Sequence, residues 1–362
     1  MSDSRIPTAP WWRARKVLVT GGAGFIGSNL VSRLVSEGAN VKVVDNLERG
    51  QLEYLEPFLP GIEFTNADLR DADTCHAACR DREVVFHLAS KVGGIQYYIQ
   101  NAGEVFRANT QIDRNVWEAA LALRVPYYFY ASSAHIYPAE LQGTPDSPAI
   151  REDQAIPANP QLSYGWAKLA GERMIQFDLD QGAQTRAAVA RIIGAYGPNQ
   201  STDLATGSAI PVFCRRAAMY PREGPFVALG TGRETRSFHY VTDTVEGILR
   251  AVAKLEKANA VGPFNLGAEG RISIGQLVNE VIRVSGKSIQ VNWDASRPTL
   301  IWGQTLSCKF ARGLLDGWEP SVSLREGLAA CYRDITARLV GSEAGGLPSQ
   351  RTGAIAGAQS CG

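Results

Sequence analysis

A tyrosine and a lysine four positions apart are the first residues of this chain whose types and spacing could do chemistry. Tyr164 and Lys168 stand in the run YGWAK, and a spacing of four places both side chains on one face of a helix. An ammonium group beside a phenol favours the phenolate, so we expect Lys168 to lower the pKa of Tyr164. Such a tyrosine can take the proton of a substrate hydroxyl group while hydride leaves the same carbon. The pair therefore predicts a base for the oxidation of an alcohol.

Two further candidates for the catalytic site, Ser133 and His135, follow an apolar run. The run YYFYASS ends at Ser133, which places this hydroxyl group at the carboxyl end of a predicted strand, where it can hydrogen-bond the reacting oxygen. An imidazole has an unperturbed pKa of about 6.5, so His135 can give or take a proton near neutral pH. The alternative, which stays open, is that His135 only hydrogen-bonds the substrate or a backbone carbonyl.

A glycine-rich turn near the beginning of the chain predicts a dinucleotide site. The run GGAGFIG follows the apolar run KVLVT and precedes a helical pattern. Gly21 permits the tight turn, Gly24 lets the backbone approach a pyrophosphate, and Gly27 lets the helix pack closely on the sheet. The N-terminus of the following helix offers free N–H groups to phosphate oxygens.

An aspartate at the end of the second apolar run indicates which dinucleotide binds. The carboxylate of Asp45 can accept hydrogen bonds from ribose hydroxyl groups and repels a 2′-phosphate, so we expect NAD rather than NADP. Asp68 follows the third predicted strand and either bonds the adenine amino group or caps a helix. The residues expected to bind the cofactor are Gly21, Gly24, Phe25, Ile26, Gly27, Asp45, Asn46, Asp68, Leu69, Leu88, Ala89, Tyr164 and Lys168.

The elements that must position these residues alternate between strand and helix. This alternation predicts an α/β fold, a Rossmann-type doubly wound parallel sheet, with a smaller α/β C-terminal lobe that binds the substrate. Strands are expected at 16–20, 41–44, 63–64, 84–88, 127–131, 187–193 and 289–293, and helices at 109–123, 164–179, 241–255 and 273–285. The expected divisions are a flexible leader (1–15), an NAD-binding domain with the catalytic residues (16–196), a substrate-binding lobe (197–340) and a disordered tail (341–362).

Composition argues against several classes of partner. The 362 residues carry a net charge of +1, so no excess charge favours a nucleic acid or a membrane surface. No stretch reaches the roughly 18 apolar residues that a membrane helix needs. The six cysteines include no CxxC pair and no cluster with histidines, which predicts reduced thiols in a cytoplasmic protein and no metal site.

The motifs together identify a resemblance to a known family. The chain resembles the extended short-chain dehydrogenase/reductases that act as nucleotide-sugar epimerases and dehydratases, over about residues 16–334. The resemblance rests on GGAGFIG (21–27), VVDN (43–46), HLAS (87–90), SSAHIYP (132–138), YGWAK (164–168), YGP (196–198) and GTGRETRSFHYVTD (230–243).

This resemblance implies a substrate and a reaction. The substrate is a nucleotide-diphosphate sugar, and residues matching Ser133, Tyr164 and Lys168 oxidise one of its hydroxyl groups, usually at C4, to a transient ketone. Residues matching Arg236 and Arg297 grip the diphosphate, a role that suits the planar guanidinium fork. The resemblance also implies a homodimer formed through the helices that contain residues 109 and 164.

Departures from the family pattern bear on which carbon is inverted. The motifs are most similar to those of the GDP-mannose 3,5-epimerases, which carry a cysteine in place of His135 and a lysine in place of Ser208. Dehydratases carry an Asp-Glu pair where this chain has Ala134 and His135. We therefore expect inversion at C4, which needs no further acid/base pair. The alternatives are 3,5- or 5-epimerisation with His135 as acid/base, a dehydratase, and a non-catalytic binding protein, against which the intact Tyr164 and Lys168 argue.

Overall fold

A seven-stranded, wholly parallel sheet forms the centre of the molecule. In the computed structural model, which describes residues 9–296 and 299–344, the strand order is β11–β6–β5–β4–β1–β2–β3. The strands are β1 (Lys16–Thr20), β2 (Asn40–Asp45), β3 (Ile62–Asn66), β4 (Val84–His87), β5 (Tyr127–Ser133), β6 (Arg186–Ile192) and β11 (Ala260–Leu266). The predicted Rossmann-type sheet is confirmed.

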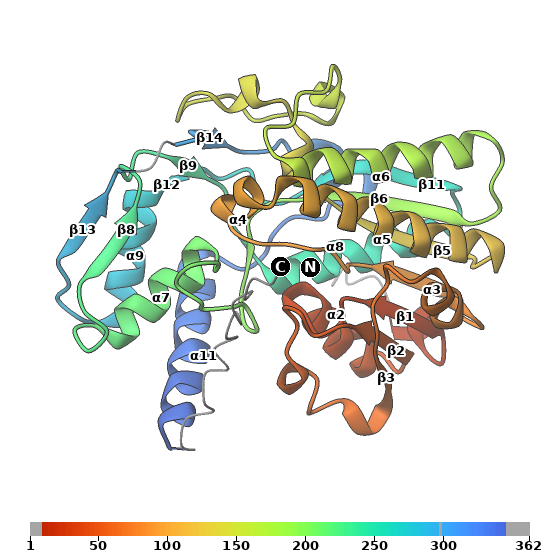
Figure 1. The fold of residues 1–362 in the computed structure, drawn as a ribbon, viewed down its shortest axis with the longest axis horizontal. Coiled ribbons are helices and arrows are strands. Elements are labelled where there is room, and N and C mark those ends of the chain that lie inside the picture. Colours follow the sequence, from red (N-terminus) through yellow and green to blue (C-terminus); the bar gives the residue numbers. More distant parts are fainter. Residues whose placement is uncertain (1–8, 297–298, 345–362) are drawn as a thin grey trace, which may run out of the picture.

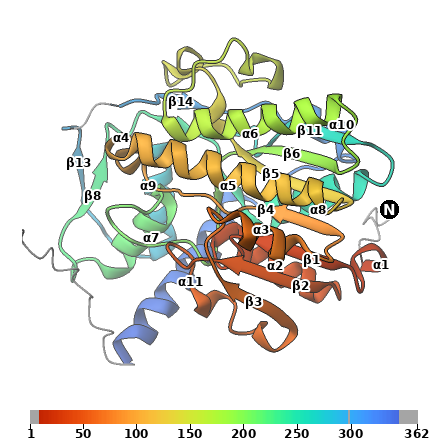
Figure 2. The ribbon, with the colours of Figure 1, turned by 45° about the vertical axis from the view of Figure 1, so that its right-hand side comes forward.

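Helices cover both faces of this sheet (Figures 1 and 2). One face carries α2 (Phe25–Ser36) and α8 (Val241–Lys254), and the other carries α3 (Ala72–Cys79), α5 (Ala102–Ala122) and α6 (Ser163–Asp180). In both views α5 and α6 lie side by side. Because both faces are covered, the strands read as apolar runs such as KVLVT and VVFH instead of alternating with polar residues.

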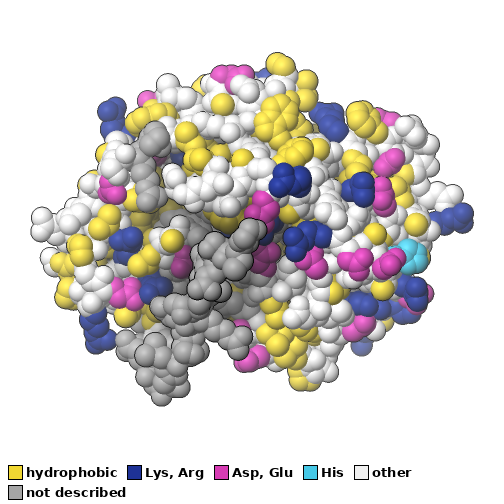
Figure 3. Space-filling view, viewed as in Figure 1, with side chains coloured by type: hydrophobic (Ala, Val, Ile, Leu, Met, Phe, Trp, Pro, Cys, Tyr) yellow, Lys and Arg dark blue, Asp and Glu magenta, His cyan; other side chains and the backbone are white. Residues whose placement is uncertain are grey.

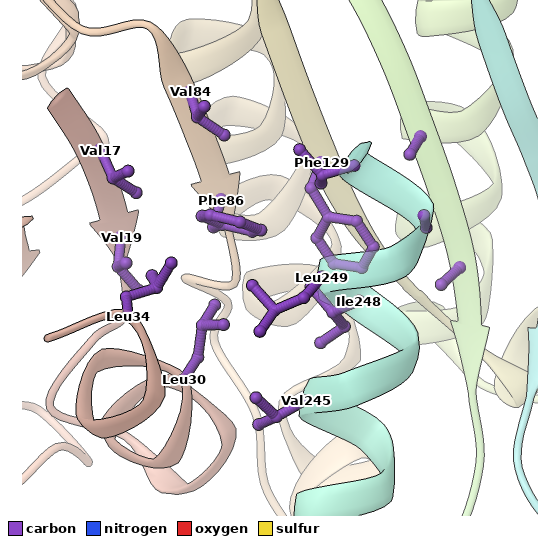
Figure 4. Close-up of a cluster of buried hydrophobic side chains, with 14 of the residues drawn as sticks. Val17, Val19, Leu30, Leu34, Val84, Phe86, Phe129, Val245, Ile248 and Leu249 are labelled. Atoms are coloured by element: carbon purple, nitrogen blue, oxygen red, sulfur yellow. The ribbon is translucent and has the colours of Figure 1, made fainter. Parts of the chain in front are cut away.

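Fully buried aliphatic and aromatic side chains hold α2 and α8 on their face of the sheet (Figure 4). Burial of each such side chain stabilises the fold by about 1.5–3 kcal/mol. The residues labelled in this cluster are Val17, Val19, Leu30, Leu34, Val84, Phe86, Phe129, Val245, Ile248 and Leu249. This packing fixes the start of α2, and with it the glycine turn, against the carboxyl end of β1.

A smaller α/β lobe with its own apolar cluster lies beside the main sheet (Figure 1). It contains α7 (Ala209–Met219), α9 (Ile274–Ser285), α11 (Leu324–Ala344) and the parallel pair β8 (Phe226–Leu229) and β13 (Val291–Asp294). Shorter elements are β7 (Ala195–Tyr196), β9 (Thr235–Arg236), β10 (His239–Tyr240), β12 (Ile272–Ser273), β14 (Gly303–Gln304) and α10 (Lys309–Leu314). Single 3-10 turns occur at Leu52–Tyr54, Leu59–Gly61, Ala134–Ile136, Ala139–Gln142 and Glu152–Ala155.

Two elements from beyond residue 197 return to the central sheet. Strand β11 pairs with β6 as the seventh strand of the sheet, and α8 packs against one face of that sheet. The segment expected as a substrate-binding lobe (197–340) therefore also contributes a strand and a helix to the domain that contains the dinucleotide cavity. Strand β11 contains a Gly-Pro pair and a break in register between Val261 and Phe264, which is why its sequence carries no clear strand pattern.

The expectation of a flexible leader over 1–15 is wrong for residues 9–15. Helix α1 (Ala9–Trp12) places Trp12 in the core, with its ring centre 5.7 Å from that of Phe86. Arg15 then forms ion pairs with Glu83 at 3.1 Å and Glu256 at 3.6 Å. Burial of the Trp12 side chain outweighs the conformational entropy that this short segment loses when it becomes ordered. Residues 1–8 lie outside the described part of the chain.

The expected tail (341–362) begins later than predicted, because α11 continues to Ala344. Residues 345–362 lie outside the described residues. Within the described part, no helix is both long and apolar enough to cross a membrane. On the face of the molecule in Figure 3, basic and acidic side chains are interspersed.

Candidate active site

The carboxyl ends of the parallel strands open into a cavity of about 380 Å³. It lies where the strand order reverses between β1 and β4, which is where open α/β sheets bind ligands. The structure brings every residue expected to bind the cofactor, together with Ser133, to the lining of this one cavity: Gly21, Gly24, Phe25, Ile26, Gly27, Asp45, Asn46, Asp68, Leu69, Leu88, Ala89, Ser133, Tyr164 and Lys168.

The glycine turn is shaped to bring backbone close to a ligand. Gly21 has φ +68°, a conformation that favours glycine, and a Cβ added there would lie 2.8 Å from the backbone of Ala89. A Cβ on Gly27 would lie 2.1 Å from the Gly21 carbonyl oxygen, so only glycine lets α2 start there. The N-cap residue Gly24 has no side-chain cap, which leaves N–H groups of the first turn of α2 free for phosphate oxygens. These residues fit a dinucleotide pyrophosphate.

Asp45 lines the cavity beside the glycine turn. It is the last residue of β2, and its carboxylate accepts the N–H of Ala23 at 3.0 Å and of Leu47 at 2.9 Å. Burial raises the pKa of Asp45, although both hydrogen bonds oppose that shift. Each carboxylate oxygen retains acceptor capacity. Asp45 therefore fits the two hydroxyl groups of a ribose.

Asp68 lies at the same end of the cavity and pairs with Arg70. The guanidinium group of Arg70 approaches the Asp68 carboxylate at 2.6 Å, and its hydrogen bonds lower the pKa of Asp68. The idea that Asp68 caps a helix is wrong: the N-cap of α3 is Asp71, whose carboxylate accepts the N–H groups of Asp73 and Thr74. Contact of Asp68 with adenine stays a prediction.

The Tyr164–Lys168 pair lies on the first turns of α6, and both side chains are buried. The Lys168 ammonium is 6.0 Å from the centre of the Tyr164 ring and 3.3 Å from the carboxylate of Asp113. Burial raises the pKa of Tyr164, against a hydrogen bond with Ser90 that lowers it. The lowered pKa that we expected from Lys168 is thus not what the structure has, because burial raises the pKa of Tyr164 and the negative charge of Asp113 adds to that shift.

Ser133 and His135 lie at the end of β5, beside Tyr164. Ser133 Oγ accepts the N–H of His135 at 3.2 Å and lines the cavity, whereas His135 is absent from its lining. The imidazole ring meets the Tyr164 ring edge-on, with centres 5.9 Å apart. Burial and the nearby guanidinium of Arg236 lower the pKa of His135 to about 4. The imidazole is therefore neutral at pH 7, rather than poised to exchange protons there.

A second tyrosine, which the sequence pattern does not single out, covers the catalytic one. Tyr98 lies on α4 (Ile95–Gln100), and its ring stacks on that of Tyr164 with centres 5.1 Å apart and planes 10° apart. Its ring is also 6.2 Å from His135. The short helix α4 has no amphipathic repeat, so only the run of two tyrosines after a Gly-Gly pair could have drawn attention to it.

Of the two arginines expected at the substrate diphosphate, Arg236 lies within the described residues. Arg236 lies on β9 outside the cavity lining, and donates to the carbonyl oxygens of Thr235 at 2.7 Å and Ile301 at 2.9 Å. Burial lowers the pKa of Arg236 to about 10. Arg297 lies outside the described residues. Among the residues described, no group of three or more His, Cys, Asp or Glu side chains could hold a metal ion.

Comparison with known proteins identifies the family. Residues 17–267 match the model of the NAD dependent epimerase/dehydratase family. This chain belongs to that family. Membership makes the protein an NAD-dependent enzyme and agrees with the dinucleotide cavity found at the strand ends.

Relatives and solved structures of this family resemble the chain over most of its length. It is 31% identical to GDP-mannose 3,5-epimerase 1 of Oryza sativa subsp. indica over 325 residues, 89% of this chain and 82% of that protein. A UDP-glucose 4-epimerase of Thermotoga maritima, solved with UDP-glucose, superposes with TM-score 0.79 and 27% identity, covering 90% of this chain and 99% of that one. A UDP-glucuronic acid 4-epimerase of Bacillus cereus, solved with UDP-glucuronic acid and NAD, gives TM-score 0.77 and 26% identity, covering 89% and 99%.

Proposed function

We propose that this enzyme is a nucleotide-sugar epimerase that inverts C4 through a transient 4-keto sugar. The observation that carries the proposal is the convergence of Ser133, Tyr164 and Lys168 at one end of the dinucleotide cavity. The 4-epimerases among the similar structures support the same reaction.

Each residue of the site has a part in this reaction. Bound NAD supplies the acceptor, and later the donor, of the hydride. Ser133 hydrogen-bonds the C4 oxygen and holds it toward Tyr164, which takes the hydroxyl proton and later returns it. Lys168 stabilises the phenolate form of Tyr164 and holds the nicotinamide ribose. Rotation of the keto sugar before reduction presents its other face and yields the C4 epimer.

Inversion at C3 or C5 would need two more groups that exchange protons, one on each face of the sugar ring. His135 has a pKa of about 4, so at neutral pH it is a weak base and is not available as an acid. Ser208, the N-cap residue of α7, accepts a hydrogen bond from Gln200 at 3.2 Å and is a poor partner for proton transfer. These two environments favour C4 inversion.

A second candidate, 3,5- or 5-epimerisation, is favoured by Tyr98. Its ring lies beside both His135 and Tyr164, so the sugar site would offer a phenol and an imidazole in addition to the catalytic pair. The rice relative named a GDP-mannose 3,5-epimerase supports this alternative. A dehydratase is less well supported, because Ala134 and His135 stand where an acidic pair is needed.

We also propose that the enzyme is a cytoplasmic homodimer, which pairs through α5 and α6. Large apolar side chains on these helices and on neighbouring α4 are 40–59% exposed: Ile99, Phe106, Trp166 and Phe177. A second copy that covered them would remove this apolar surface from water. The five described cysteines are free and buried, which suits a reducing compartment.

Turnover in heavy water separates the two epimerase reactions. The enzyme would be incubated with UDP-glucose, UDP-glucuronic acid and GDP-mannose, and recovered sugars analysed by mass spectrometry and proton NMR. We expect a C4 epimer with no deuterium at C3 or C5, only modest slowing in His135→Asn, and loss of turnover by about 10²–10⁴ in Tyr164→Phe. Deuterium at C5 that disappears in His135→Asn would replace C4 inversion with the second candidate.

A further inference from the structure

A buried carboxylate, Asp113, lies against the catalytic pair, and the reaction proposed above does not use it. Asp113 is on α5 with its side chain 1% exposed. Its Oδ1 is 2.9 Å from His87 Nε2 and 3.3 Å from Lys168 Nζ, and its Oδ2 accepts the hydroxyl hydrogen of Tyr130 at 2.5 Å. A buried carboxylate is costly unless it is paired and hydrogen-bonded. All the partners that stabilise Asp113 come from α6 and from strands of the central sheet.

The hydrogen bonds of this cluster fit one arrangement of protons. Thr20 Oγ1 accepts the N–H groups of Leu88 and Ala89, each at 3.2 Å, so its own hydrogen is free to point at His87 Nδ1, 2.8 Å away. Burial lowers the pKa of His87, which keeps the ring neutral. The remaining ring proton is then on Nε2 and is donated to Asp113. The carboxylate is thereby linked to the strand ends that line the cofactor cavity.

We propose that Asp113 is a positioning residue for this enzyme: its carboxylate holds the Lys168 ammonium beside Tyr164 and ties it, through His87 and Thr20, to the cofactor cavity. The proposal rests on the proposed function of Tyr164 as the proton-transfer group. A lysine has a long flexible stem and three donor hydrogens, so an ammonium without an anchor would sample several positions. The Asp113 contact restricts the ammonium to a place that it shares with the rings of Tyr130 and Tyr164, 4.7 and 6.0 Å away.

The same carboxylate affects the ionisation of Tyr164. Burial is the larger cause of the raised pKa of Tyr164, and the negative charge of Asp113 raises it further. An uncharged group at this position would leave the charge of Lys168 unbalanced, so the pKa of Tyr164 should fall. The titratable or charged groups that face Tyr164 come from four segments: Lys168 on α6, Asp113 on α5, Tyr98 on α4, and Tyr130 with His135 on and just after β5.

The test replaces Asp113 by its uncharged isostere in the full-length chain. Titration of Tyr164 is followed by ultraviolet difference spectroscopy against Tyr164→Phe, a readout that needs no turnover. We expect Asp113→Asn to move this titration to lower pH by about 0.5–1 unit, a fraction of the shift that a charge in direct contact causes. We also expect kcat to fall about tenfold with little change in KM, because Asp113 touches no substrate.

Asp178→Asn is the matched control. It removes a carboxylate from the far end of α6 that accepts a hydrogen bond from Trp117 on α5, at 2.7 Å. Asp178 is fourteen positions beyond Tyr164, about 21 Å along a helix. Its removal changes the net charge and the contact between α5 and α6. The pH at which Tyr164 titrates and the value of kcat should both stay unchanged.

Several outcomes decide the proposal. A folded Asp113→Asn whose Tyr164 titration stays in place or moves to higher pH overturns it. If Asp113→Asn does not fold, Asp113→Glu keeps the charge and displaces it by one methylene; a normal kcat in that variant also overturns the proposal, and a reduced kcat supports it. If the unmodified enzyme turns over no nucleotide sugar, the proposed function fails, while the difference titration still tests Asp113.

Discussion

At the residue scale, burial drives the two candidate proton-transfer groups of the site toward their neutral forms. It raises the pKa of Tyr164 and lowers that of His135 to about 4, so neither side chain carries charge at pH 7. The charged pair in the same place is Lys168 and Asp113, 3.3 Å apart. Lys168 is therefore the charge that must stabilise the phenolate when Tyr164 takes a proton.

Cofactor selectivity is a prediction for one residue, Asp45. Its buried carboxylate faces the cavity and would lie against a 2′-phosphate, so NAD should bind more tightly than NADP by about 1–3 kcal/mol. Asp45→Asn should remove most of this preference, as measured by titration of the apo-protein with both dinucleotides. Glu53→Gln, which removes an exposed carboxylate from the following segment, is the control for net charge. Equal affinities of the unmodified protein for both cofactors would contradict the role given to Asp45.

At the scale of the element, the observed bounds of helices and strands differ most from the predicted ones where tertiary contacts hold a segment in place. Helix α5 begins at Ala102 rather than Asn109, because Val105 in its first turns packs with Tyr98 on α4 and Tyr164 on α6, a contact that no apolar repeat in this segment announces. Strand β11 is held by pairing with β6 in spite of its Gly-Pro pair. The bounds of both elements are thus set by packing on elements that are distant in the sequence, α6 for α5 and β6 for β11.

The four-residue helix α1 should contribute to stability far beyond its length. Trp12 is fully buried between Phe86 and Trp11, with ring centres 5.7 and 4.4 Å away. Trp12→Ala should lower the free energy of unfolding by about 3–5 kcal/mol, as measured by urea denaturation. The exposed Phe310→Ala serves as the comparison and should cost much less. Equal losses in the two variants would mean that α1 does not dock on the sheet in solution.

At the scale of the whole molecule, buried histidines predict sensitivity to acid. Burial lowers the pKa of His135 and of His239 to about 4. In the unfolded chain these groups bind protons below about pH 6.5, whereas the folded protein does not bind them until about pH 4. The free energy of unfolding should therefore fall as pH decreases through this window, by up to about 1.4 kcal/mol per pH unit for the fully buried His239 and by less for the partly exposed His135.

His239 offers the sharper test, since it does not line the cavity and its Nε2 is 2.7 Å from Thr244 Oγ1 in the core. Urea denaturation at several pH values between about 4 and 7 gives the slope of stability against pH. His239→Gln should lower stability near pH 7 and make that slope shallower. A variant with an unchanged slope would show that His239 is protonated equally in the folded and unfolded states.

The sequence by itself determined the sheet type, the dinucleotide turn and the Tyr164–Lys168 pair, because these depend on spacing along one segment. Strand, glycine turn and helix follow from local periodicity, and a separation of four residues is enough to place two side chains on one helix face. Membership of the epimerase/dehydratase family rests on the same local motifs, and the comparisons confirm it. The roles of the individual site residues stay predictions.

Only the tertiary structure decided the electrostatics of the site and the neighbours of the catalytic pair. Asp113, His87 and Lys168 are far apart in the sequence and meet because α5, α6 and β4 pack together. Tyr98 covers Tyr164 for the same reason. A pKa depends on how much water is excluded around a group and on which charges lie near it, and spacing along the chain contains neither quantity. Hence the sequence predicted a lowered pKa for Tyr164 and an unperturbed one for His135, whereas packing raised the first and lowered the second.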